Sequence, residues 1–152
     1  MEKKKDNIKN NMLPTIIKGN SYIDARGSLK YNNDFNVSQV KRIYSIENAN
    51  IQSKRGWQGH KIEQRWFSAF SGKFEIMVIK IDNWDKPDLN SKPFVFELSS
   101  DTLDFLHIPS SYVNCIQAIE ENSKLLIMAD YILGEVDDEC KFLLEQFKCT
   151  KN

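Results

Sequence analysis

The sequence predicts an all-β fold, either a sandwich or a barrel, with one short helix near the C-terminal end. Short segments rich in apolar, aromatic and β-branched residues recur along most of the chain, and turn residues such as Pro109-Ser110-Ser111 separate them. Apolar residues take up a helical spacing only after residue 137. The length of 152 residues suits one domain that buries most of its apolar surface.

The first half of the chain is expected to form short strands joined by turns. Apolar residues over 13–18 predict a strand that ends at Gly19-Asn20, and residues 28–31 predict another, between turns at 24–27 and 32–34. Residues 40–46 alternate apolar with polar or aromatic side chains, which is typical of a half-buried strand. A polar loop over 47–54 then leads to a stretch with two glycines, residues 55–61.

The second half adds further strands and the helix. Residues 65–70 and 74–81 flank Ser71-Gly72-Lys73, and this arrangement predicts a β-hairpin with a tight glycine turn. Four more strands are expected over 94–98, 103–108, 112–119 and 124–131. Apolar residues recur at helical spacing over 137–147, where Asp137 and Asp138 favour a helix start.

Composition argues against several classes of function. The 21 basic residues balance the 21 acidic ones, so no net field favours nucleic acid or a membrane surface. No apolar run approaches the roughly 20 residues that span a bilayer, and the N-terminus lacks the apolar core of a secretion signal. The 3 cysteines are odd in number and widely spaced, which predicts reduced thiols and a cytoplasmic protein. We expect a disordered polar tail over 1–12 and a single domain over 13–150.

The stretch 55–61 is the candidate functional site. It contains His60, whose type of side chain titrates nearest neutral pH, and Arg55, whose guanidinium suits a phosphate or a carboxylate. Gly56 and Gly59 let the backbone bend or approach a ligand closely. The alternative is a surface loop in which His60 is merely solvated.

The order of several motifs resembles that of small cupins that act on nucleotide-linked sugars. The segments that carry this resemblance are Asp24-Ala25-Arg26-Gly27-Ser28-Leu29, Lys41-Arg42-Ile43-Tyr44, Arg55-Gly56-Trp57-Gln58-Gly59-His60-Lys61, residues 106–114, Ala129-Asp130-Tyr131 and Asp137-Asp138-Glu139. Two subgroups share this layout: the dTDP-4-dehydrorhamnose 3,5-epimerases and the WxcM-like dTDP-4-keto-6-deoxyglucose 3,4-ketoisomerases.

The resemblance implies a cupin jelly-roll β-barrel of two packed antiparallel sheets, usually a homodimer, with a dTDP-sugar bound in the barrel mouth. It also implies a role in deoxysugar and surface polysaccharide biosynthesis. His60 matches the second histidine of the ketoisomerase pattern R-G-x-H-x-H-K, and Gln58 stands at the first, where the epimerases carry their catalytic histidine. Asn114 replaces a histidine that is usual in the later strand.

The chemistry of a 4-keto-6-deoxyhexose suggests roles for these residues. Moving the carbonyl from C4 to C3 requires a base that removes the C3 proton and returns one at C4, and His60 could do both through an enediol. Tyr44 could donate to the developing enolate oxygen or return a proton, although it could equally be a barrel tyrosine with a satisfied hydroxyl. Gln58 can orient a substrate hydroxyl but cannot exchange a proton at neutral pH.

Binding is assigned to basic and aromatic residues. Arg55 and Arg26 are the natural ligands of the diphosphate, and Arg42 and Lys61 are weaker candidates. Trp57 could stack on the nucleotide.

Metal catalysis needs three or four converging His and carboxylate ligands. The chain has only His60 and His107 and no H-x-H pair, and His107 is expected to be structural, so we expect neither a metal nor a cofactor. We therefore expect a 3,4-ketoisomerase. A 3- or 3,5-epimerase, or a sugar-nucleotide-binding cupin without catalysis, stays open.

Overall fold

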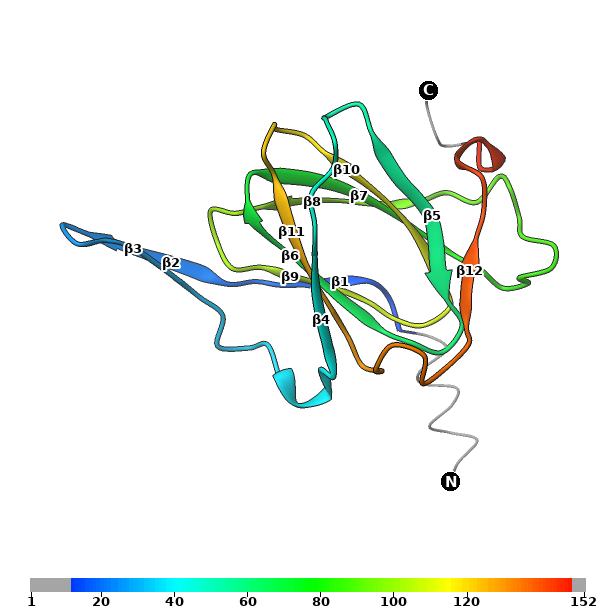
Figure 1. Cartoon of the computed structure of the whole chain (residues 1–152), viewed down its shortest axis with the longest axis horizontal. Helices are drawn as coiled ribbons and strands as arrows, with labels where there is room; N and C mark the ends of the chain where they lie inside the picture. The colour runs from blue at the N-terminus through cyan, green and yellow to red at the C-terminus, as the bar shows by residue number, and fades with distance from the viewer. Residues whose placement is uncertain (1–11, 149–152) are drawn as a thin grey trace.

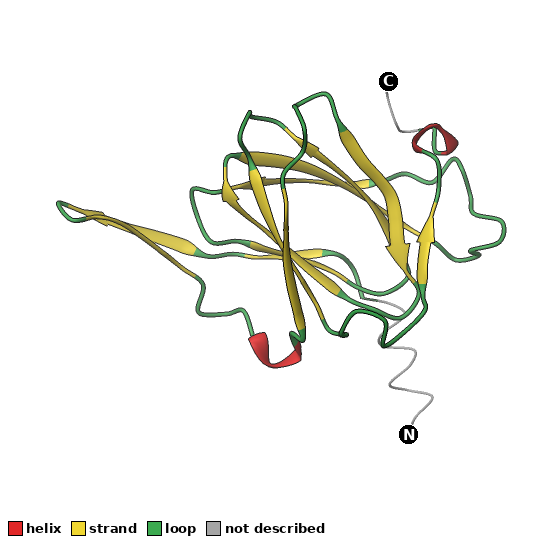
Figure 2. Cartoon of the chain, viewed as in Figure 1, coloured by secondary structure: helices red, strands yellow, loops and turns green. Residues whose placement is uncertain are grey.

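The protein is built from two antiparallel sheets that face each other and enclose a barrel-like interior (Figures 1 and 2). The computed structural model describes residues 12–148. In the first sheet the strands follow the order β1 (Thr15–Ile17), β9 (Phe105–Ile108), β6 (Arg65–Ser71), β11 (Lys124–Ala129) and β4 (Arg42–Ile46). In the second the order is β12 (Glu139–Lys141), β5 (Lys54–His60), β10 (Tyr112–Ala118), β7 (Lys73–Lys80) and β8 (Phe94–Ser99). This confirms the all-β barrel.

The main core lies between the two sheets. Side chains alternate between the two faces of a strand, so every second residue points inward. Its buried members are Phe67, Ala69, Phe74, Ile76, Val78, Leu98, Leu106, Ile108, Tyr112, Ile116, Ala118, Leu125 and Ile127. Tyr44 and Ile46 of β4 pack against this cluster, which places the side chains of alternate β4 residues inside the barrel.

Two smaller clusters cover the outer faces of the sheets. On the second sheet, Trp57 packs with Val113 and Phe147, a contact that fastens the C-terminal segment to the barrel wall. On the first sheet, Trp66 packs with Phe105 and Met128. Because both faces of β6 and β10 are covered, these strands are buried over most of their length without the simple alternation of a half-exposed strand.

The hairpin predicted over 65–81 is wrong. β6 pairs with β9 and β11 of the first sheet, whereas β7 pairs with β10 and β8 of the second. Gly72 (φ +70°) therefore turns the chain from one sheet to the other, and a Cβ at this position would meet Ser123 Oγ at 2.0 Å. Apolar residues on both faces suit two neighbouring strands in different sheets as well as two strands of a hairpin.

The helix predicted over 137–147 is also wrong. The segment forms β12, which pairs with the edge of β5, and then a single 3-10 turn, η2 (Leu144–Gln146). Leu143 is 64% exposed while Phe147 is 1% exposed, so the apolar residues of this segment do not share one buried face. Backbone pairing with the free edge of β5 outweighs the helical spacing.

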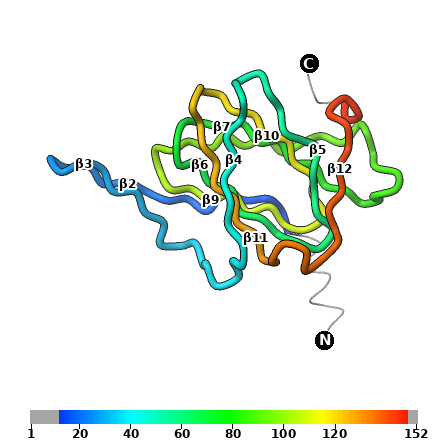
Figure 3. Tube along the Cα trace, in the orientation of Figure 1, coloured from blue at the N-terminus to red at the C-terminus, as the bar shows by residue number. Residues whose placement is uncertain are grey.

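A separate hairpin, β2 (Asn20–Asp24) and β3 (Gly27–Tyr31), projects from the body of the molecule (Figure 3). The connection to β4 contains a 3-10 turn, η1 (Val37–Gln39). The tail predicted over 1–12 lies, apart from Met12, outside the described residues. Within residues 12–148, no helix is long and apolar enough to cross a membrane.

Candidate active site

His60 is the last residue of β5 and faces the barrel interior. It pairs in register with Tyr112, whose side chain belongs to the core between the sheets, and cross-strand partners share a face. His60 is 6% exposed. Gly59 permits this position, because a Cβ there would meet the carbonyl oxygen of Tyr112 at 2.2 Å. The close approach made by this glycine is therefore to β10.

Two carboxylates hold the imidazole from one side. His60 Nδ1 lies 3.0 Å from Glu63 Oε2 and 3.1 Å from Asp138 Oδ1. Ionised carboxylates only accept hydrogen bonds, so Nδ1 carries the hydrogen and donates it. The opposite nitrogen, Nε2, is buried and has no hydrogen-bond partner among residues 12–148. In its neutral form the ring has an unshared electron pair on Nε2, as a general base requires.

Asp138 is anchored by the backbone of the turn that follows His60. Its Oδ2 accepts hydrogen bonds from the backbone N–H groups of Ile62, at 2.9 Å, and Glu63, at 2.7 Å. Burial alone would raise the pKa of Asp138, but the hydrogen bonds from the Glu63 amide, His60 and the Ile62 amide outweigh it and lower the pKa. Asp138 is therefore ionised near neutral pH, and it fixes both the position and the tautomer of His60.

A chain of polar contacts leads from His60 to the opposite sheet. Arg65 Nη2 donates to Glu63 Oε2 at 2.8 Å, and Arg65 Nη1 donates to the Tyr44 hydroxyl. Arg42 also lies over the Tyr44 ring, with its guanidinium carbon 4.6 Å from the ring centroid. Burial raises the pKa of Tyr44, the charges of Arg65 and Arg42 lower it, and Glu63 and Glu139 raise it again, with a net increase. The phenol therefore keeps its proton at neutral pH.

The same cluster includes a geometry that could hold a metal ion. Single ligand atoms of His60, Glu63 and Asp138 all lie within 4.8 Å of one another. These carboxylates are already engaged by the Arg65 cation and by two backbone N–H groups, which favours a hydrogen-bonded site over a cation site. The expectation that the reaction uses no metal stays a prediction.

A β-bulge brings Arg55 to the same face as His60. Gln58 lies opposite Asn114 and Arg55 lies opposite Ile116, so β5 contains one more residue than β10 between these pairs. Without the extra residue, Arg55 and Gln58 would point to opposite faces. Ile116 and Asn114 are two residues apart on β10, so they share a face, and Arg55 and Gln58 share it with them.

Arg55 opens onto a cavity of about 510 Å³ at the edge of β5. Gln58 and Lys141 line the same cavity, as do Phe142 and Gln146 of the C-terminal segment. Asn114 is 7% exposed, so the amides of Asn114 and Gln58 form part of the inner wall next to this opening. Trp57 and Phe142, which belong to the outer cluster, also line this cavity, and His60 does not.

Comparison with known families gives one decisive match. The family described as FdtA, WxcM-like, C-terminal matches residues 10–145. The chain belongs to the WxcM-like family. A comparison with curated proteins finds no significant match.

Solved structures of similar fold include two kinds of enzyme. The 3,4-ketoisomerase QdtA from Thermoanaerobacterium thermosaccharolyticum, solved as a variant with TDP-4-keto-6-deoxyglucose, has a TM-score of 0.65 at 22% identity, over 85% of this chain and 88% of that one. The TDP-quinovose 3,4-ketoisomerase WlaRB from Campylobacter jejuni gives 0.58 at 22% identity, over 82% and 90%. The dTDP-4-dehydrorhamnose 3,5-epimerase from Bacillus anthracis, with TDP and PPi bound, gives 0.68 at 12% identity, over 87% and 79%. These likenesses confirm the cupin jelly roll.

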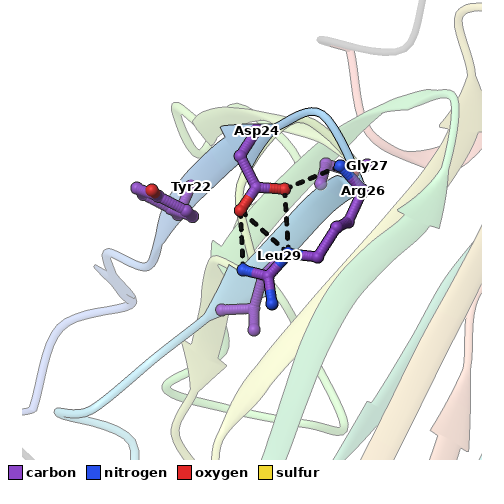
Figure 4. Close-up of a pocket in the computed structure, with 6 residues that line it drawn as sticks. Tyr22, Asp24, Arg26, Gly27 and Leu29 are labelled. Atoms are coloured by element: carbon purple, nitrogen blue, oxygen red, sulfur yellow. Dashed lines mark hydrogen bonds and ion pairs between the residues drawn. The ribbon is translucent and has the colours of Figure 1, made fainter.

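Two predicted site residues of this WxcM-like protein, Arg26 and Trp57, lie away from the histidine, and a third, Lys61, is its exposed neighbour in the chain. Arg26 is at the tip of the β2–β3 hairpin, where its side chain is 87% exposed and pairs with Asp24 at 2.6 Å (Figure 4). Trp57 is 0% exposed in the outer cluster, which leaves no ring face for a nucleotide, and we reassign it to the core. Lys61 is exposed beyond the end of β5, next to His60 in the chain. Arg42, Tyr44, Gln58 and His60 face the interior of the barrel. Arg55 is exposed near the start of β5, where the bulge turns it to the same side of the strand.

Sequence reasoning missed the charged residues that surround His60. Glu63 and Arg65 follow it closely in the chain, but their spacing alone does not indicate that they surround the imidazole. Asp138 stands where the sequence predicts a helix start. The signal that could have found it is the pair Asp137-Asp138 at the end of the family layout, because a buried histidine generally needs a carboxylate or carbonyl partner.

Proposed function

We propose that this protein is a 3,4-ketoisomerase acting on a dTDP-linked 4-keto-6-deoxyhexose. The observation that carries the proposal is His60, a buried imidazole inside the barrel. Its Nδ1 donates to Asp138 beside the Glu63 carboxylate, and its Nε2 is unpartnered among the described residues. Family membership and the ketoisomerases of similar fold support the same reaction class. The Asp138 carboxylate keeps the ring in the tautomer that can take a proton from carbon.

In the proposed reaction, His60 moves one hydrogen between neighbouring carbons. Its Nε2 takes the C3 proton, the electron pair of that bond forms a C3=C4 double bond, and the carbonyl pair moves to O4. The imidazolium is held by Glu63 and Asp138 at 3.0 and 3.1 Å, which stabilises the charge that forms. His60 then returns the proton to C4, while O3 gives up its hydroxyl proton, O4 gains one, and the carbonyl forms at C3. Tyr44, held by Arg65, is placed to donate to the oxygen that becomes negative.

The diphosphate is proposed to bind at the rim of the barrel mouth. Arg55 and Lys141 line one cavity together with Gln58, which shares its face of the sheet with His60. Two cations suit the charge of a diphosphate, and a guanidinium can contact it with two parallel hydrogen bonds. Arg42, which lies over Tyr44 on the opposite wall, is a further candidate for the sugar or phosphate end.

We also propose a homodimer. The projecting β2–β3 hairpin exposes Tyr22 (59%), Ile23 (74%) and Leu29 (58%), and a two-stranded hairpin is only marginally stable by itself. Burial against a second copy would remove this apolar surface from water. Sedimentation of the full chain tests the oligomeric state. A single monomer species at micromolar concentration contradicts the homodimer.

The reaction is tested with dTDP-4-keto-6-deoxyglucose in deuterium oxide, followed by NMR. The ketoisomerase predicts that the carbonyl migrates from C4 to C3. Deuterium at C3 or C5 without migration indicates a 3- or 3,5-epimerase and contradicts the proposal. Nucleotide binding without any exchange indicates a binding cupin and contradicts it as well.

A further inference from the structure

Glu139 lies beside His60 at the barrel mouth. It opens β12 and pairs in register with His60 on β5. Side chains directly opposite each other on antiparallel strands share a face, with Cβ atoms about 4.5–5.5 Å apart. Because His60 faces the interior, Glu139 faces it too. The Glu139 side chain is 43% exposed against 7% for His60, so Glu139 sits nearer the opening and His60 lies deeper.

One oxygen of the Glu139 carboxylate is fixed and the other is left for a ligand. Gln58 Nε2 donates to Oε1 at 2.8 Å, and Lys141 Nζ lies 3.3 Å from the same oxygen. Within residues 12–148, Oε2 makes no hydrogen bond or ion pair. The carboxylate is therefore oriented by two donors while retaining an oxygen that can exchange a proton.

The charge of Glu139 acts on the opposite wall of the barrel. The pKa of Tyr44, raised chiefly by burial, is also raised by the negative charges of Glu63 and Glu139. Tyr44 lies on β4 in the other sheet and packs against the barrel core. Glu139 and His60 on the second sheet and Tyr44 on the first thus face the same barrel interior.

We propose that Glu139 is a second catalytic residue, which carries the hydroxyl proton of the substrate from O3 to O4. This inference rests on the proposed ketoisomerase activity and extends it. Isomerisation moves two protons: one from C3 to C4, and one from O3 to O4. His60 has one free nitrogen to exchange protons with carbon, and Gln58 cannot exchange a proton. Glu139 is the ionisable group beside both.

The two transfers balance without any other reactant. His60 takes the C3 proton and leaves a double bond between C3 and C4 with negative charge on O4. Glu139 Oε2 accepts the O3 proton and delivers it to O4, while the O3 electron pair forms the new carbonyl. The C3=C4 pair takes the proton held by His60 at C4. Both side chains end as they began, and no electrons leave the substrate.

Glu139→Gln separates the two transfers, because it removes the exchangeable carboxylate and keeps its size. We expect carbonyl migration to fall by about 100-fold or more, the usual range for a lost acid–base group. Exchange of the C3 hydrogen with deuterium oxide needs only His60 and should stay within about threefold of the wild type. Glu139→Asp, which restores a carboxylate, should recover part of the migration rate.

The matched control is Glu145→Gln, the same change at an exposed residue of η2. Its exchange and migration rates should equal those of the wild type. Migration that is unchanged in Glu139→Gln overturns the proposal, and so does a parallel loss of exchange and migration, which would indicate a general disturbance of the site. Absence of migration in the wild type overturns the ketoisomerase itself, a result distinct from either of these.

Discussion

Asp138→Asn tests how the hydrogen bonds of one buried carboxylate set the tautomer of His60, the proposed base. Asp138 is 5% exposed and accepts from His60 Nδ1 as well as from the amides of Ile62 and Glu63. An amide side chain keeps one oxygen. If that oxygen stays with the two backbone N–H groups, the introduced NH₂ faces His60 Nδ1, and donor meets donor. This arrangement disfavours the hydrogen on Nδ1, which only Glu63 Oε2, at 3.0 Å, would still accept. It favours the tautomer with the hydrogen on Nε2, which lacks the lone pair that takes the proton from carbon.

The expected effects are separate for stability and for rate. One charge-assisted hydrogen bond is lost in a buried position, so the free energy of unfolding should fall by about 1.5–3 kcal/mol. The rate of carbonyl migration should fall by about 100- to 10 000-fold, the range of general acid–base catalysis, with little change in dTDP affinity. Urea unfolding, an NMR assay of the product and dTDP titration measure the three quantities.

Asp137→Asn is the matched control, because it makes the same charge change one residue earlier at an exposed position. A surface substitution of this kind should change stability by no more than about 0.5 kcal/mol. If the Asp138→Asn and Asp137→Asn variants catalyse carbonyl migration at rates within about threefold of each other, the tautomer argument is refuted.

Three other predictions concern binding, packing and pH. Arg55→Ala should raise the KM for the sugar nucleotide about tenfold, the equivalent of about 1.4 kcal/mol, with kcat nearly unchanged; an unchanged KM would place the diphosphate elsewhere. Trp57→Ala should lower the free energy of unfolding by about 3–5 kcal/mol in urea titrations, because the ring is 0% exposed, whereas a loss below about 1 kcal/mol would contradict its core role. Burial lowers the pKa of His107 below its usual 6.5, so below pH 6.5 the unfolded chain binds more protons than the folded chain, and the stability should fall there. The fall in melting temperature from pH 7 to pH 5.5 should therefore be smaller in His107→Gln than in the wild type. An equal fall in the two proteins would contradict this.

The strand content of the fold could be predicted because turn residues and apolar runs are local signals. The pairing of the strands could not be predicted, as β6 and β7 demonstrate. Both faces of each strand are apolar, so the sequence around Gly72 fits a hairpin and a change of sheet equally well. The helix predicted for the C-terminal segment was wrong for a related reason. A helical spacing is local, whereas the free edge of β5 that captures residues 139–141 is set by the tertiary fold.

The site was predicted in part. His60 stands out because the chain has only 2 histidines, and the structure places it inside the barrel, while its catalytic role stays a prediction. Arg55 could not be placed on the face of His60 by counting residues, because their separation is odd and a bulge restores the alignment. Asp138 lies 78 residues from His60 in sequence, so only the folded chain reveals their contact.

The role of His60 is tested most directly by a hydrogen-exchange experiment in deuterium oxide. The exchange of the C3 hydrogen of dTDP-4-keto-6-deoxyglucose is compared between the wild type and His60→Asn at equal dTDP occupancy. The base assigned to Nε2 predicts rapid incorporation with the wild type and a loss of at least about 100-fold with the variant, while dTDP binds both proteins with similar affinity. Incorporation by His60→Asn at a rate near that of the wild type would show that another group removes the proton, and would contradict the mechanism.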